Sequence, residues 1–266
     1  VLIGGSVVYV ASMAGFYELW YKDFETTAFH SFNDNSEWLQ MDKIGHVGTS
    51  YQLSKWGQKV FVWTGLSDRK AAWYGAGVST LYQTSIEVFD GFSTEWGFSV
   101  GDVLSNTAGT GFFLGQELLW EEQRMTFKYS FHNTKYPKYR PSLLGQSQVE
   151  KLIKDYNGQT IWLSANIKSF GFEETKIPEW LNLSVGYGAE GMITAKENDP
   201  VIQELNLPEF NRYRKYFFAP DISLTKIETN SKVLKTVFDV FEFVKIPMPT
   251  LEVDEKGNVK IHALYF

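Results

Sequence analysis

The chain has 266 residues, a formal net charge of −6 and no cysteine. The negative charge argues against a nucleic-acid partner, and the lack of cysteine excludes disulfides, thiol catalysis and cysteine-ligated metals. Aromatic residues make up 17% of the chain, which is well above the usual content of soluble proteins. Because Trp and Tyr favour places with one apolar and one wet side, this excess indicates a large interface or a membrane boundary.

Four helices are predicted in the first half, at about residues 1–22, 42–64, 68–90 and 100–123. Glycine and serine make the first of them weakly hydrophobic, so we expect a helix buried in protein rather than a signal peptide or a transmembrane helix. Glycines and serines recur in the third and fourth helices, at residues 75, 77, 79, 109, 111 and 115. Glycine disfavours helices, so this recurrence predicts that neighbouring helices approach closely.

The second half of the sequence alternates between apolar and polar residues, which is typical of strands. Strands are predicted at residues 125–131, 159–166, 181–187, 213–218, 221–227, 251–253 and 259–264, with a hairpin turn at 254–257. One amphipathic helix is expected at about 231–244, and residues 136–141 and 196–208 are predicted to be surface connections.

These elements predict an α+β fold with two domains that pack as one unit. Residues 1–123 would form a helical bundle, and residues 124–266 would form a β-rich portion with one amphipathic helix and a hairpin near the C-terminus.

Polar residues gather at the ends of the predicted helices. Asp42/His46 and Asp102/Asn106 are four residues apart and Glu87/Asp90 are three apart, so each pair shares a helix face. We expect these side chains to meet inside the bundle, where they must satisfy one another. The predicted polar network consists of Asp42, Lys43, His46, Glu87, Asp90, Ser99, Asp102 and Asn106.

Three kinds of chemistry fit these residues. Acid–base catalysis would use His46 with Asp42, Glu87 or Asp102, and a Ser99–His46–Asp102 triad would need a strand that the sequence does not place before Ser99. Histidine with carboxylates also suits a metal, but a single His with no paired-ligand spacing argues against one. We therefore predict no metal or cofactor, and a structural hydrogen-bond network in which Ser99 or Asp102 caps the fourth helix.

The motifs of this network resemble those of the YfiM-like family of predicted periplasmic lipoproteins of unknown function. The resemblance is carried by Asp42-Lys43-x-x-His46, by Glu87-x-x-Asp90, and by Gly97-Phe98-Ser99-x-Gly101-Asp102-x-x-x-Asn106-x-x-Gly109. VanZ-like membrane proteins have a similar pattern. A longer form that continues through residues 139–141, 155–160 and 180–182 is similar to the large envelope members of the family. The lipobox cysteine of a lipoprotein has no counterpart here.

The resemblance implies a location at the periplasmic face of the outer membrane. It also implies an accessory subunit of an outer-membrane machine, such as the plug of the type IX secretion translocon, whose partner is a large outer-membrane β-barrel. The hypothesis is therefore a non-enzymatic docking subunit with peripheral membrane association. The alternatives are an envelope hydrolase or a lipid- or glycan-binding protein that uses the His46 cluster, and an integral membrane bundle of the VanZ kind.

Overall fold

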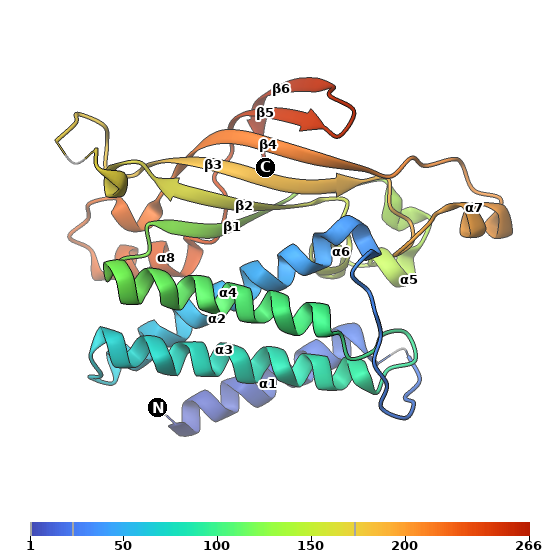
Figure 1. Ribbon diagram of the computed structural model, residues 1–266, viewed down its shortest axis with the longest axis horizontal. Helices are drawn as coiled ribbons and strands as arrows, with labels where there is room; N and C mark the ends of the chain where they lie inside the picture. Colours follow the sequence, from blue (N-terminus) through green and yellow to red (C-terminus); the bar gives the residue numbers. More distant parts are fainter. Residues whose placement is uncertain (1, 23, 173) are drawn as a thin grey trace. The chain divides into compact units, whose positions relative to one another are not determined.

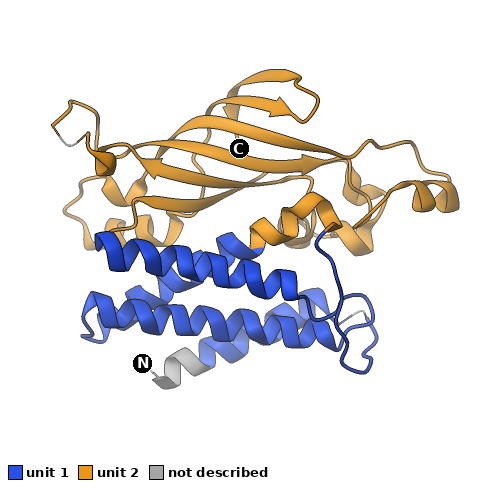
Figure 2. Ribbon diagram, viewed as in Figure 1, with its two compact units in different colours: residues 1–35, 46–121 blue, residues 36–45, 122–266 orange. Residues whose placement is uncertain are grey.

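The computed structural model describes residues 2–22, 24–172 and 174–266, and it confirms the α+β fold (Figure 1). The chain divides into two compact units (Figure 2). Unit 1 comprises residues 1–35 and 46–121, and unit 2 comprises residues 36–45 and 122–266. The short segment 36–45 therefore belongs with the β-rich part, although it precedes most of the helices in the sequence.

Unit 1 is helical, and its helices begin and end close to the predicted positions. They are α1 (Leu2–Trp20), α2 (Met41–Trp63), whose first turn belongs to unit 2, α3 (Asp68–Gly91) and α4 (Val100–Trp120). Ser67 is the N-cap residue of α3, and Gly65 has a φ of +90° that favours glycine. No helix in the described part of the chain combines the length and hydrophobicity that a membrane crossing requires.

Two of the predicted close approaches between helices occur. A Cβ atom on Gly75 would lie 2.4 Å from the Ser54 carbonyl oxygen, and one on Gly109 would lie 2.1 Å from the Val47 carbonyl oxygen. Both α3 and α4 therefore approach α2 at a glycine. The prediction is wrong for the glycines at 77, 111 and 115, where an added Cβ would meet no atom of the described residues within 4 Å.

Unit 2 is built on a six-stranded antiparallel sheet in which each strand pairs with the next in the sequence. The strands are β1 (Met125–Phe131), β2 (Gln159–Asn166), β3 (Leu181–Glu190), β4 (Tyr213–Ile222), β5 (Met248–Asp254) and β6 (Val259–Tyr265). The short helices are α5 (Pro141–Leu144), α6 (Gln148–Lys154), α7 (Asp199–Leu205) and α8 (Lys232–Phe241), with 3-10 turns at Glu37–Gln40, Tyr136–Lys138, Lys168–Phe170 and Leu224–Lys226.

Two predictions about unit 2 are wrong. The predicted strand at 221–227 does not form, because β4 continues to Ile222 in register with Leu181 and a 3-10 turn follows. The segment 196–208 is mostly exposed, as predicted, and contains α7. The segment 136–141 is not a plain surface connection, since it contains a 3-10 turn at Tyr136–Lys138. Tyr136 is buried there in an apolar cluster with Trp38, Met41 and Leu144.

The two faces of the sheet differ in an unusual way. In β1 the buried positions are Thr126, Lys128 and Ser130, whereas the apolar and aromatic positions between them are only half-buried. Trp162 and Phe217 join this buried, largely polar face. Antiparallel sheets in water normally bury their apolar face, so here the usual arrangement is reversed.

Charged side chains at the centre of the buried face pair with one another. Lys128 Nζ lies 3.0 Å from Asp221 Oδ2 and 3.5 Å from Glu242 Oε1, and Lys245 Nζ lies 3.3 Å from Asp221 Oδ1. All four side chains are at most 1% exposed. Two cations and two anions balance in charge, which burial of such groups requires. Burial lowers the pKa of Lys245, and the Asp221 carboxylate opposes that change.

The start of α2 is held by unit 2. Trp38, Leu39 and Gln40 adopt left-handed φ values of 47°, 51° and 64°, which are costly for residues other than glycine. The Trp38 amide donates to the Ala195 carbonyl at 2.7 Å, and the Arg214 guanidinium donates to Gln40 Oε1 at 2.7 Å. These contacts hold residues 38–40 within unit 2.

Candidate functional site

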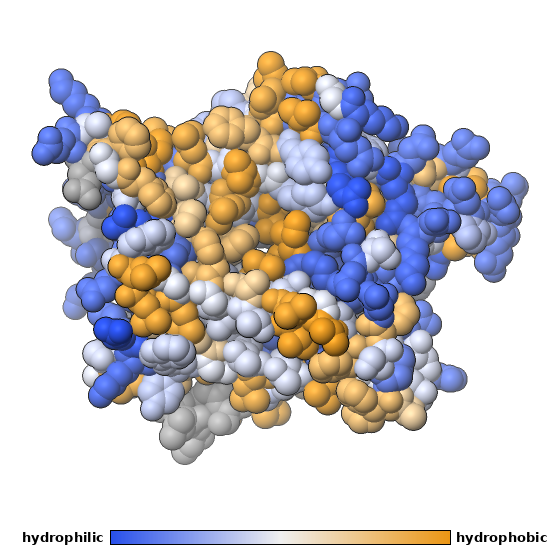
Figure 3. Space-filling view, viewed as in Figure 1, coloured by the Kyte–Doolittle hydropathy of each residue, from blue (hydrophilic) through white to orange (hydrophobic). Residues whose placement is uncertain are grey.

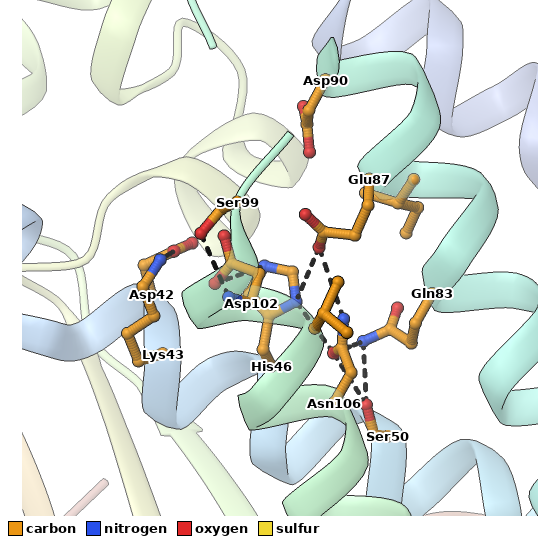
Figure 4. A network of polar contacts seen from close by, with 12 residues as sticks. Asp42, Lys43, His46, Ser50, Gln83, Glu87, Asp90, Ser99, Asp102 and Asn106 are labelled. Atoms are coloured by element: carbon orange, nitrogen blue, oxygen red, sulfur yellow. Dashed lines mark hydrogen bonds and ion pairs between the residues drawn. The ribbon is translucent and has the colours of Figure 1, made fainter. Parts of the chain in front are cut away.

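His46, on α2, lies between carboxylates from two other helices of unit 1 (Figure 4). Its Nδ1 is 3.7 Å from Glu87 Oε1 on α3, and its Nε2 is 3.7 Å from Asp102 Oδ1 on α4. Glu87 and Asp102 are buried, whereas the His46 side chain keeps 18% of its surface exposed. The two carboxylates are placed to balance a protonated imidazole ring.

Asn106, on α4, accepts more hydrogen bonds than any other side chain in this cluster. Its Oδ1 accepts from Ser50 Oγ at 2.9 Å and from Gln83 Nε2 at 2.8 Å, and it lies 3.0 Å from His46 Nδ1. Its Nδ2 donates to Glu87 Oε1 at 3.3 Å. An amide oxygen can only accept, so Nδ1 of His46 must carry a proton in this arrangement.

Close packing of α4 on α2 makes these contacts possible. Gly109 follows Asn106 by three residues, and its Cα faces the backbone of Val47, the residue after His46. A larger residue at 109 would push the two helices apart. The close approach of α4 to α2 at Gly109 thus lies next to the polar cluster around His46 and Asn106.

Ser99 has a structural partner rather than a catalytic one. Its hydroxyl donates to Asp34 Oδ1 at 2.6 Å and accepts from the Asp102 amide at 3.1 Å, which makes Ser99 the N-cap of α4. Because the only hydroxyl proton goes to Asp34, it is not donated to His46. The geometry therefore does not form the Ser99–His46–Asp102 triad.

Asp90, Asp42 and Lys43 also have partners outside the contacts around Asn106. Asp90 accepts from Tyr21 Oη at 2.8 Å, and burial, followed by the charge of Asp90, raises the pKa of Tyr21. Asp42 belongs to unit 2, where it contacts Lys43 Nζ at 3.0 Å and accepts from Tyr156 Oη at 2.8 Å.

Several members of the network were not predicted. Ser50 and Gln83 join it through Asn106, and Ser79 donates to the Ser50 carbonyl at 2.8 Å. One signal was present in the sequence: Ser79, Gln83 and Glu87 follow one another at four-residue spacing on one face of α3.

The chemistry open to the site is narrow. Glu87 and Asp102 lie at opposite nitrogens of the His46 ring. Most members are less than 10% exposed and hydrogen-bonded to one another. Such a closed network stabilises the contacts between α2, α3 and α4.

Residues 30–115, which carry the network, match the model of a family described as predicted periplasmic lipoprotein (DUF2279). The match covers 86 of the 266 residues. It supports the predicted resemblance to periplasmic lipoproteins, but it gives no support to the VanZ-like pattern or to the role of a translocon plug. No curated protein and no solved structure matches the chain.

Proposed function

We propose that this chain is a non-catalytic protein of the cell envelope, at the periplasmic face of the outer membrane. In this proposal it docks on a large outer-membrane β-barrel protein as an accessory or plug subunit of a secretion translocon. The family match over residues 30–115 supports the envelope location. One structural observation supports docking: α3 of unit 1 buries small and polar residues and exposes apolar and aromatic ones.

The two faces of helix α3 show this distribution of side chains. Its buried face consists of small and polar residues, including Gly75, Ser79, Gln83 and Glu87. Its exposed face carries Tyr74, Val78, Leu81 and Val88 at helical spacing, and the neighbouring Trp73 is 57% exposed. Exposed apolar residues along a whole helix indicate a binding surface, and Trp and Tyr are frequent at the energetic centres of protein interfaces.

The test is purification of the tagged native chain in mild detergent, with co-eluting proteins identified and quantified by mass spectrometry. We expect one outer-membrane β-barrel protein in stoichiometric amount. The variant Trp73→Ser/Leu81→Ser removes the centre of the α3 surface and should lose this partner while remaining folded. Trp63→Ser, at an exposed position at the end of α2, is the matched control and should retain it. Undiminished binding by the double variant would exclude the α3 surface.

A hydrolase that uses His46 is the second candidate, favoured by the partial exposure of that ring between two carboxylates. His46→Asn separates the two ideas, because an asparagine amide can donate where Nδ1 does but cannot act as a base. A structural His46 predicts that His46→Asn binds the partner like the native chain. Loss of cellular function with unchanged stability and partner binding would instead support the hydrolase.

A further inference from the structure

The outer face of the sheet in unit 2 is apolar from one edge strand to the other. Strand register places six residues in one row across β1 to β6, namely Phe127, Leu163, Val185, Phe218, Leu251 and Ile261. The next rows on the same face lie two residues before and two residues after it on each strand. Their paired residues are all apolar residues, tyrosine or proline. At β1 and β2, Phe127, Tyr129 and Ile161 pack against the apolar cluster that contains Trp38 and Met41. We call the part of these three rows on β3 to β6 the apolar band.

Much of the apolar band is open to solvent. Val185 is 54%, Phe218 is 49% and Ile261 is 79% exposed. In Figure 3, hydrophobic residues in orange extend over the strands of unit 2, whereas hydrophilic residues in blue cover the region of α7 and the β5–β6 turn. A patch of this extent on a water-exposed sheet needs a covering partner.

The opposite face of the same strands identifies the kind of partner. It holds Lys128, Lys215 and Asp221, all buried, and Lys215 is paired with Glu190 at 3.0 Å. On these strands, charged side chains therefore lie on the buried face and apolar side chains lie on the outer face. Strands that face lipid show this alternation, since hydrocarbon cannot satisfy a charge or a hydrogen-bonding group.

Side chains at the two ends of the band follow the layering of a membrane surface. At one end Tyr187 and Tyr216 pack edge to face, and the ion pair between Arg214 and Glu255 lies beyond them. At the other end the β2–β3 connection exposes Phe170, Phe172 and Trp180. Aromatic residues concentrate where hydrocarbon meets the polar headgroups.

Helix α8 continues the apolar surface at the second end of the band. The Ser223 amide, just after β4, donates to the Trp180 carbonyl at 2.8 Å, and α8 begins at Lys232. Most of its apolar side chains, among them Leu234, Val237 and Phe241, are more than 40% exposed. An amphipathic helix that leaves its apolar face uncovered is typical of the membrane interface.

We propose that the apolar band and α8 insert unit 2 into one leaflet of a lipid membrane, with acyl chains covering the band. Leu181 to Tyr187 spans about 20 Å at about 3.4 Å per residue, which is less than the roughly 30 Å hydrocarbon core. A protein partner would bring hydrogen bonds and a polar rim around the patch. Here charged residues occur only beyond the aromatic ends, which is the stratification of a bilayer.

Flotation of the purified full chain with phosphatidylcholine vesicles tests this proposal without any protein partner, so its result is independent of the proposed docking function. We expect binding that persists at 0.5 M salt, because apolar contact rather than charge drives it. The variant Val185→Thr/Phe218→Thr/Ile261→Thr should lower the partition coefficient about a hundredfold. Val149→Thr/Leu205→Thr changes two exposed apolar residues on α6 and α7 and should leave it unchanged.

Depth measurements complete the test and do not depend on the threonine variants. Because the native chain has no cysteine, an environment-sensitive label at Val185→Cys or Ile261→Cys reports on one position. We expect its emission to shift to the blue with vesicles and to be quenched by nitroxides on the acyl chains. Lys256→Cys, in the exposed β5–β6 turn, should show neither effect. Absence of vesicle binding, or a dimer that shields Val185 and stays off vesicles, would overturn the proposal.

Discussion

At the scale of single residues, Asn106 contributes more to the stability of unit 1 than its size suggests. One amide group takes part in hydrogen bonds with side chains from α2 and α3 while it is itself 8% exposed. Its loss would leave donors of Ser50 and Gln83 buried without an acceptor. Unsatisfied buried groups cost more than the bonds themselves contribute.

Asn106→Leu should therefore lower the free energy of unfolding by about 3 kcal/mol, as about 1–3 kcal/mol is expected for each orphaned buried group. Urea denaturation followed by circular dichroism measures this change. Thr107→Ala is the control, because Thr107 is exposed and bonds only to the Val103 carbonyl of its own helix. Equal stability of the two variants would contradict the role given to Asn106.

His132, at the end of β1, makes stability depend on pH. Burial lowers its pKa, the positive charge of Lys215 adds to this, and the carboxylates of Glu190 and Glu252 oppose it. The unfolded chain then binds the proton more readily than the folded chain. His132 thus favours folding above its ordinary pKa of about 6.5, and this contribution is lost as the pH falls below that value.

The melting temperature of the native chain should accordingly fall when the pH is lowered from 7.5 to 5.5. The melting temperature of His132→Gln should fall less over the same interval. Differential scanning calorimetry at the two pH values gives the comparison. His30→Gln is the control, since His30 belongs to unit 1 and is not among the charged groups that act on His132. A drop of the same size in His132→Gln would assign the pH dependence to other groups.

At the scale of elements, the glycines of α3 separate two effects that the sequence cannot distinguish. Gly75 contacts the backbone of α2, whereas Gly77 faces open space. Both cost the helix backbone entropy. Only at Gly75 does the absence of a side chain allow two helices to meet.

Gly75→Ala should therefore lower the free energy of unfolding by at least ~2 kcal/mol through overpacking, and Gly77→Ala should raise it by about 1 kcal/mol through helix propensity. Chemical denaturation of both variants checks the pair. A gain in stability for Gly75→Ala would show that α2 and α3 separate without penalty.

The helices and strands were predictable because turn residues, cap residues and the period of the hydrophobic pattern are local properties of the sequence. Gly65 and Ser67 separate α2 from α3, and Asp254 to Gly257 turn β5 into β6. The choice between the two sheet faces was not predictable. Alternation at Lys128 or Val185 shows that the faces differ, but burial of the charged face depends on tertiary pairing with Glu242 and Lys245.

The site was partly predictable for the same reason. Helical spacing indicated Glu87, Asp102 and Asn106, which do meet His46. It also grouped Asp90 with Glu87, but a three-residue step rotates the helix enough for Asp90 to reach Tyr21 instead. Ser50 and Gln83 carry no signal on their own, since these residue types are common on solvated helices.

At the scale of the molecule, both units enclose polar groups and expose apolar ones. Glu87 and Asn106 in unit 1 and Lys128 and Asp221 in unit 2 are buried. Leu104 on α4 and Ile261 on β6 are 65% and 79% exposed. Water alone does not favour this distribution, and we propose that a protein or lipid partner covers the surface of each unit.

The isolated chain should consequently self-associate in detergent-free buffer and become monodisperse in a mild non-ionic detergent. Light scattering coupled to size-exclusion chromatography measures both states, and a dye that binds exposed apolar surface should lose fluorescence when detergent is added. A detergent-free monomer that binds no dye would contradict the inverted distribution of side chains.

The segment of unit 2 at residues 36–45 lies upstream of residues 46–121 of unit 1 and of all the rest of unit 2 in the sequence. Trp38 and Met41 pack with Tyr136, Ile161 and Met192, residues that are synthesised about 100 to 150 positions later. During vectorial synthesis or export, Trp38 and Met41 therefore stay exposed until the residues of the sheet that bury them have been synthesised. A chaperone that shields nascent hydrophobic segments would have its earliest client site here, well before the chain's hairpins can form.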